Sequence, residues 1–141
     1  MEVGHVRNQL RGAIEAARGR AQARREHVAR AEKSFATFLE RATPVLKGLA
    51  SALRSEGIAF TLFTPEHALR LASDRSRVDF VELTLDATSD PPAVVVHSSH
   101  ARGSRTLDEE RPLATGTWPH DITEEELLAQ VLQSLAPWLE K

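Results

Sequence analysis

Small and apolar residues recur every seven positions between Leu10 and Ala52, and this repeat constrains the fold more than any other feature of the chain. Two such rows side by side on a helix are typical of the seam of a coiled coil or of a long bundle helix. Arg24 is the only residue that interrupts them. We expect an association seam that contains Leu10, Ile14, Ala17, Ala21, Val28, Ala31, Phe35, Phe38 and Ala42.

The seam predicts one helix over about residues 5–42 and a second over about residues 44–54. Thr43 and Pro44 mark the boundary between them, because threonine suits an N-cap and proline suits the first helical position. The seam nevertheless continues in register as far as Leu49, which favours a kink with a shared apolar face over a reversal of the chain.

From Ile58 onward the apolar period changes to two, which is typical of strands. Residues 65–72 allow two interpretations, a short strand or a helical turn capped by Thr64. Turn residues separate the apolar runs closely enough for neighbouring strands to pair antiparallel. We expect a meander of four or five strands, with segments near 58–63, 69–72, 78–86 and 93–100 and a weaker one that begins at Ser104. The chain thus divides into a helical arm, residues 1–56, and an α+β body, residues 57–141.

The last segment carries a clear helix start, because Thr123 and Glu126 have the spacing of a capping box. Pro137 should kink or end this helix. The helix is expected to cover one face of the sheet. The expected core places Leu83, Leu85, Val94 and Val96 beneath Leu128, Val131, Leu132 and Leu135. The fold class is therefore α+β, with a long N-terminal coiled-coil-like helix, an antiparallel β-meander and a C-terminal packing helix.

The opposite face of the predicted sheet is too polar for a second full core and too apolar to be wholly solvated. It would carry Phe80, Glu82, Thr84, Val95 and His97. Either the helix over residues 44–54 packs across this face, or the face stays open to bind a protein or peptide partner.

The length of the arm predicts a partner for the seam. A helix of about 38 residues extends about 57 Å, whereas a body of about 85 residues is roughly 30 Å across. We therefore expect the body to leave the seam uncovered and a homodimer to bury it. Parallel pairing would bring two copies of Arg24 together, whereas antiparallel pairing can oppose Ile14 with Phe38 and Ala17 with Phe35. A helix that bends back onto its own body is the alternative.

The formal net charge of −2 conceals an uneven distribution. Residues 1–41 hold nine Lys/Arg and five acidic residues, a balance of +4, and the rest of the chain holds nine and fifteen, a balance of −6. Basic helices are often simply solvated, but they also suit an anionic partner. The candidate anion-binding residues are Arg18, Arg20, Arg24 and Arg25. They predict an alternative function, sequence-independent nucleic-acid binding, against which the acidic body argues.

The sequence predicts no catalytic, metal or cofactor site. The chain has no cysteine, which excludes disulfides and cysteine-based zinc sites. His97 and His100 are three residues apart, so on a regular strand they point to opposite faces and cannot share a metal ion. The serines near them lack a nucleophile-elbow motif, and the sequence has no glycine-rich phosphate loop.

The N-terminus lacks an apolar leader, and no run of about 18 apolar residues occurs, so we expect a cytoplasmic protein that does not enter a membrane. Taken with the seam, this predicts a non-enzymatic oligomeric adaptor. Such a protein would self-associate through its N-terminal helix and present its α+β body to a partner.

Overall fold

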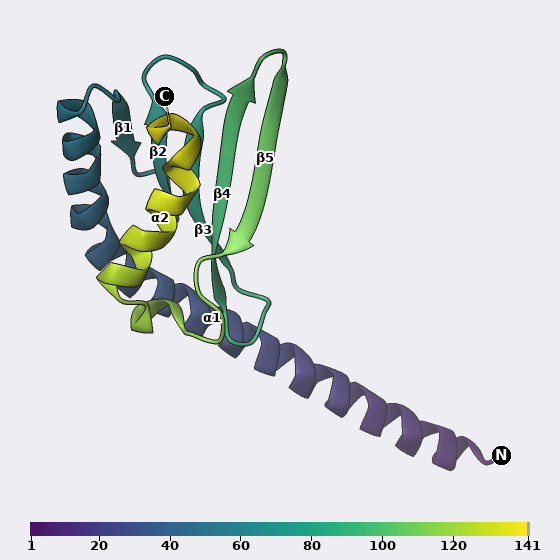
Figure 1. Ribbon diagram of the computed structural model, residues 1–141. Coiled ribbons are helices and arrows are strands. Elements are labelled where there is room, and N and C mark those ends of the chain that lie inside the picture. Colours follow the sequence, from purple (N-terminus) through teal and green to yellow (C-terminus); the bar gives the residue numbers. More distant parts are fainter. Residues whose placement is uncertain (141) are drawn as a thin grey trace.

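The computed structural model describes residues 1–140 and contains two helices and a five-stranded antiparallel sheet (Figure 1). The helices are α1 (Val3–Ser55) and α2 (Glu124–Leu139), and a short 3-10 turn, η1 (Pro119–Asp121), precedes α2. The strands are β1 (Phe60–Phe63), β2 (Leu69–Ser73), β3 (Phe80–Asp86), β4 (Ala93–Arg102) and β5 (Arg105–Pro112). The predicted α+β fold is confirmed.

α1 is a single helix of 53 residues with Pro44 in its interior, so the expected boundary at Thr43 is a bend and not an end. Proline lacks the N–H that would bond the carbonyl four residues earlier, and its ring crowds that carbonyl. The Thr43 hydroxyl donates to the Leu39 carbonyl at 2.7 Å, which also bends helices. Figure 1 shows α1 changing direction between its projecting N-terminal part and the part beside the sheet.

The five strands follow one another as a simple meander, β1-β2-β3-β4-β5. Residues 69–73 form β2, which settles the two interpretations of this segment in favour of a strand. Leu83 opposes Val96 in the pairing of β3 with β4, as their alternating apolar residues require. The β4–β5 hairpin turns at Gly103, whose positive φ of 63° suits glycine. The strand that begins near Ser104, for which the sequence signal was weaker, is thus β5. It pairs with β4 along most of the length of β4.

α2 begins as the capping box predicts, because the Thr123 side chain accepts a hydrogen bond from the Glu126 N–H. Its buried stripe differs from the predicted one. Leu127, Val131, Leu135 and Trp138 are buried, whereas Leu128 and Leu132 are each 37% exposed. Two adjacent rows of α2 are apolar, and the sequence pattern alone cannot decide which of them faces the core.

Both helices pack on the same face of the sheet. Leu46 and Leu49 of α1 share one core with Val94 and Val96 of β4 and with Val131 of α2. The expected alternative, in which residues 44–54 cross the opposite face, is therefore wrong. That opposite face is free of both helices, and its Phe80 and Val95 are only half-buried.

The N-terminal part of α1 projects away from the rest of the molecule (Figure 1). Every residue from Met1 to Arg20 is exposed. Contact with the body begins at His27, whose Nε2 lies 2.8 Å from the Ser89 carbonyl oxygen, and full burial begins at Ala31. We call residues 3–28 the projecting arm.

Candidate association arm and interaction surfaces

The predicted seam residues fall into two groups. Ala31, Phe35, Phe38 and Ala42 are buried by the chain's own sheet and α2. The other members lie on the projecting arm, where Leu10, Ile14 and Ala17 are exposed and Ala21 and Val28 are half-buried. The expectation that the body leaves the seam uncovered is therefore wrong for its C-terminal half.

Phe35 and Phe38 also exclude the antiparallel pairing considered above. Their rings stack with centroids 5.9 Å apart, and the two residues are 2% and 1% exposed. A second copy cannot reach them without unfolding the core, so they cannot oppose Ile14 or Ala17 of another chain. Any association through α1 must use the projecting arm alone.

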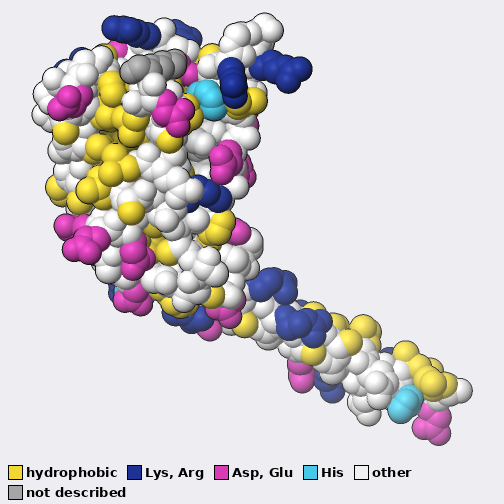
Figure 2. Space-filling model, in the orientation of Figure 1, with side chains coloured by type: hydrophobic (Ala, Val, Ile, Leu, Met, Phe, Trp, Pro, Cys, Tyr) yellow, Lys and Arg dark blue, Asp and Glu magenta, His cyan; other side chains and the backbone are white. Residues whose placement is uncertain are grey.

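The projecting arm carries an apolar stripe with arginines on both sides. Arg11, Arg18 and Arg25 directly follow Leu10, Ala17 and Arg24, so they form one row beside the stripe, and Arg20 lies on the other side. The stripe itself consists of Val3, Val6, Leu10, Ile14, Ala17, Ala21 and Val28. All four candidate anion-binding arginines are exposed here, and Figure 2 shows basic and apolar side chains side by side along this segment.

The base of the projecting arm forms a second candidate surface, which the sequence did not reveal. A shallow hollow of about 660 Å³ is lined by Arg30, Lys33, Ser34, Thr37, Trp118, His120 and Asp121. Trp118 lies between two histidines, with ring centroids 6.0 Å from His27 and 6.1 Å from His120. Because η1 is more than 80 residues from this part of α1, only the tertiary fold brings an aromatic ring beside the basic helix.

Ser34, His120 and Asp121 contact one another in the order of a catalytic triad. The serine would be the nucleophile, the histidine the base and the aspartate the acid. Ser34 Oγ is 2.6 Å from His120 Nδ1, and His120 Nε2 is 3.5 Å from Asp121 Oδ2. Ser34, however, is only 6% exposed, and its oxygen also accepts the backbone N–H of His120 at 3.0 Å. Arg41 donates to the His120 carbonyl at 2.7 Å. These bonds fasten η1 to α1, and we assign the group a structural role.

The open face of the sheet carries a continuous set of polar and aromatic contacts. Arg70 pairs with Glu82 at 2.6 Å and lies over the Phe80 ring at 4.0 Å. The Phe80 ring is also nearly perpendicular to the His97 ring, with centroids 5.2 Å apart, and His97 pairs with Asp108 at 2.8 Å. Most of the predicted partner surface is thus paired within the sheet.

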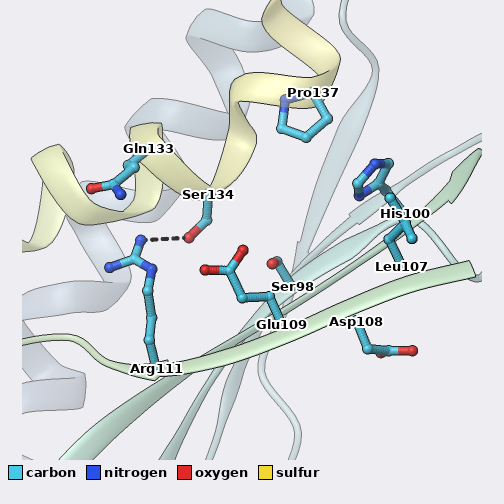
Figure 3. A pocket seen from close by; sticks show the side chains of 9 residues that line it. All are labelled: Ser98, His100, Leu107, Asp108, Glu109, Arg111, Gln133, Ser134 and Pro137. Atoms are coloured by element: carbon cyan, nitrogen blue, oxygen red, sulfur yellow. Dashed lines mark hydrogen bonds between the residues drawn. The ribbon is translucent and has the colours of Figure 1, made fainter.

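His97 and His100 lie on opposite faces of β4, as their spacing predicts. His100 is on the helix side, 5.7 Å from the Trp138 ring, and borders a hollow of about 190 Å³ (Figure 3). Arg111 lies at the other end of this hollow and donates to the Ser134 hydroxyl and the Gln130 carbonyl, both at 2.8 Å, and to the Gln130 side chain. Arg111 therefore fastens β5 to α2 and is occupied within the chain.

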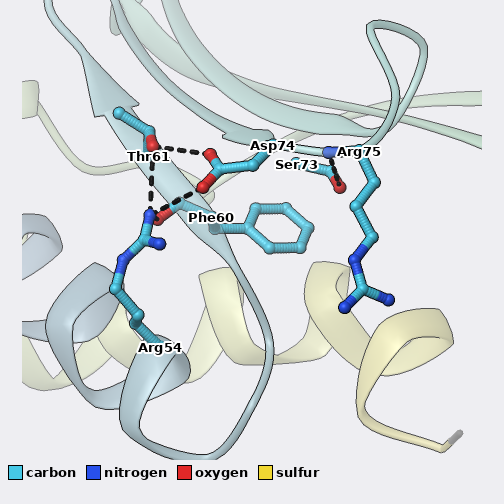
Figure 4. Close-up of polar contacts among 6 residues, drawn as sticks. All are labelled: Arg54, Phe60, Thr61, Ser73, Asp74 and Arg75. Atoms are coloured by element: carbon cyan, nitrogen blue, oxygen red, sulfur yellow. Dashed lines mark hydrogen bonds and ion pairs between the residues drawn. The ribbon is translucent and has the colours of Figure 1, made fainter.

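A further polar cluster joins the end of α1 to the sheet edge (Figure 4). Thr61 donates to Asp74 at 2.6 Å and Arg54 donates to it at 2.8 Å. The Thr61 hydroxyl, and then Arg54, hold the pKa of Asp74 below its ordinary value. Arg54 also donates to the Phe60 carbonyl, so the cluster fixes the turn from α1 into β1.

Apolar side chains also gather over α2 and the adjoining half of α1 (Figure 2). Leu128 and Leu132 are each 37% exposed, and Leu139 is 42% exposed. They occupy one row, four and seven residues apart. We call Leu128, Leu132 and Leu139 the α2 patch.

Among residues 1–140, no group of three or more His, Asp or Glu side chains is arranged to hold a metal ion. Neither helix of this part of the chain combines the length and the apolar character that crossing a membrane requires. Comparison with protein-family models, with curated protein sequences and with solved structures gave no match.

Proposed function

We propose that this chain is a non-enzymatic oligomeric adaptor that self-associates through its N-terminal helix and presents its α+β body, including the open sheet face, to a protein partner. One observation carries the proposal: a helix of more than 20 residues projects from the body with exposed Leu10 and Ile14 on one stripe. Burying each such side chain is worth about 1.5–3 kcal/mol, and association would supply this burial.

The projecting arm can be tested without disturbing the core. Leu10→Asp/Ile14→Asp should reduce the molar mass in light scattering to that of one chain, because charged side chains on the stripe oppose its burial. The melting temperature of the body should stay within a few degrees, since neither residue belongs to the core. Asn8→Asp/Ala23→Asp adds the same charge away from the stripe and should leave the mass unchanged. Equal masses for wild type and Leu10→Asp/Ile14→Asp would contradict the proposal.

The base of the projecting arm favours a second candidate, sequence-independent binding of single-stranded nucleic acid. Arg30 and Lys33 continue the basic surface of the arm toward the half-exposed Trp118 ring. Basic side chains that follow a backbone beside an aromatic ring that stacks on bases are the usual means of such binding. The acidic remainder of the chain would oppose it.

Salt dependence separates this candidate from the adaptor. If Arg18, Arg20, Arg24 and Arg25 contact phosphates, changing all four to Gln should reduce the slope of log affinity against log salt by about 3. Trp118→Ala should weaken binding by about 1–3 kcal/mol if one base stacks on it. The measurement is fluorescence anisotropy of a labelled oligonucleotide between about 50 and 200 mM salt. No binding by wild type at the lowest salt would eliminate this candidate.

A further inference from the structure

The α2 patch lies on an exclusively acidic helix. Glu124, Glu125 and Glu126 form the first turn of α2, and Glu140 follows its last residue. No Lys or Arg occurs anywhere between Thr123 and Glu140. Lys141 directly follows Glu140 in the sequence, so the negative charge beside the exposed leucines is concentrated at the N-terminal end of their row.

The projecting arm has the opposite charge around a stripe of the same kind. Arg11, Arg18 and Arg25 flank the stripe on one side and Arg20 flanks it on the other, while Glu15 and Glu26 lie on the far side of the helix. Two arms packed antiparallel would bring their rows of arginines together. Two arms packed parallel would place Arg20 near Arg25 of the mate and two Arg24 side chains in the seam. Both arrangements oppose like charges, whereas the α2 patch offers complementary ones.

The α2 patch can cover part of the stripe. At about 1.5 Å per residue, the patch extends about 17 Å from Leu128 to Leu139, and the stripe extends about 38 Å from Val3 to Val28. The arm cannot reach the α2 patch of its own chain, because it extends away from the body in line with the part of α1 that precedes the bend (Figure 1). The arm can therefore contact an α2 patch only on a second copy of the chain.

We infer that the projecting arm of one copy packs on the α2 patch of a second copy, with its arginines beside Glu124 and Glu125. This inference rests on the proposed self-association and specifies the surface that receives the arm. Reciprocal exchange of the two arms gives a closed dimer with two such contacts. A one-way contact would instead lead to open chains of molecules, whose mass would rise with concentration without reaching a defined value.

The experiment uses two full-length variants that each lack one surface. The arm variant is Leu10→Asp/Ile14→Asp, and the patch variant is Leu128→Asp/Leu132→Asp. We expect wild type to have the mass of two chains and each variant alone to have the mass of one chain in light scattering. An equimolar mixture of the two variants should again form a two-chain species, because the intact arm of one fits the intact patch of the other. That species keeps one contact instead of two, so it should form only at higher concentration.

The outcomes separate the inference from the proposal on which it rests. If the patch variant keeps the wild-type mass while the arm variant becomes a single chain, self-association stands and the inference is overturned. If each variant is a single chain and the mixture stays so, the inference is also overturned. Single-chain wild type at all concentrations overturns both. Should the patch variant melt below wild type by more than a few degrees, Leu128→Ser/Leu132→Ser replaces it, and the same comparisons decide.

Discussion

Phe38→Ala should lower the free energy of unfolding by about 3–5 kcal/mol, the usual cost of removing a buried phenylalanine side chain. Phe38 is 1% exposed, stacks on Phe35, and belongs to the core that α1 shares with the sheet and α2. Removing its ring leaves a cavity that neighbouring strands can fill only in part. The measurement is urea unfolding followed by circular dichroism.

The same experiment decides whether Phe38 belongs to the core or to an interface between chains. Substitution of a core residue destabilises each chain directly, so the loss of unfolding free energy should be the same at low and high protein concentration. Leu10→Ala on the same helix is the matched control at low protein concentration, where the chains are separate. It should then change the unfolding free energy by less than about 1 kcal/mol because Leu10 is 58% exposed. A loss below about 1 kcal/mol for Phe38→Ala would show that the described core is wrong.

Val131→Asp should unfold the chain or destabilise it by about 4 kcal/mol or more, because a carboxylate at this fully buried position has no charged partner. At a protein concentration low enough for the chains to be separate, Leu132→Asp should cost about 1 kcal/mol or less, since its side chain is 37% exposed at the edge of α2. The two variants carry the same new charge at neighbouring positions. Their difference therefore reports which row of α2 faces the sheet.

Thermal unfolding of the two variants side by side is sufficient to measure this difference. Equal destabilisation by Val131→Asp and Leu132→Asp would support the packing expected from sequence, in which both residues cover the sheet. A larger loss for Leu132→Asp would require α2 to be rotated about its axis from the described position.

Local sequence patterns predicted most of the secondary structure. Alternation of apolar residues identified β3 and β4, and the spacing of Thr123 and Glu126 identified the start of α2. These features depend on neighbours within a few positions along the chain. The same is true of the bend near Pro44, although the sequence did not show that the helix would continue through it.

Tertiary packing decided what the sequence left open. The seam has one period throughout, yet Phe35 and Phe38 pack on the chain's own sheet while Leu10 and Ile14 remain exposed. A periodic pattern identifies an apolar face but does not identify the surface that covers it. In the same way, two adjacent apolar rows of α2 gave no basis for choosing between Leu132 and Val131.

The cluster at the base of the projecting arm could not be predicted from local sequence patterns, for a different reason. Trp118 and His120 lie in a polar loop, and nothing in their sequence surroundings connects them with Ser34 or Arg30. Their association depends on the hydrogen bonds that dock η1 on α1. The proximity of a basic helix and an aromatic ring is thus a product of the fold.

Sedimentation equilibrium of the unmodified chain tests most directly whether the projecting arm is an association element. Burial of several apolar side chains should support association at concentrations from about 1 to 100 μM. In this range we expect the mass of a defined oligomer of at least two chains. Higher salt should weaken this oligomer if arginines and glutamates meet across the interface. The mass of a single chain at every concentration would contradict self-association through the N-terminal helix.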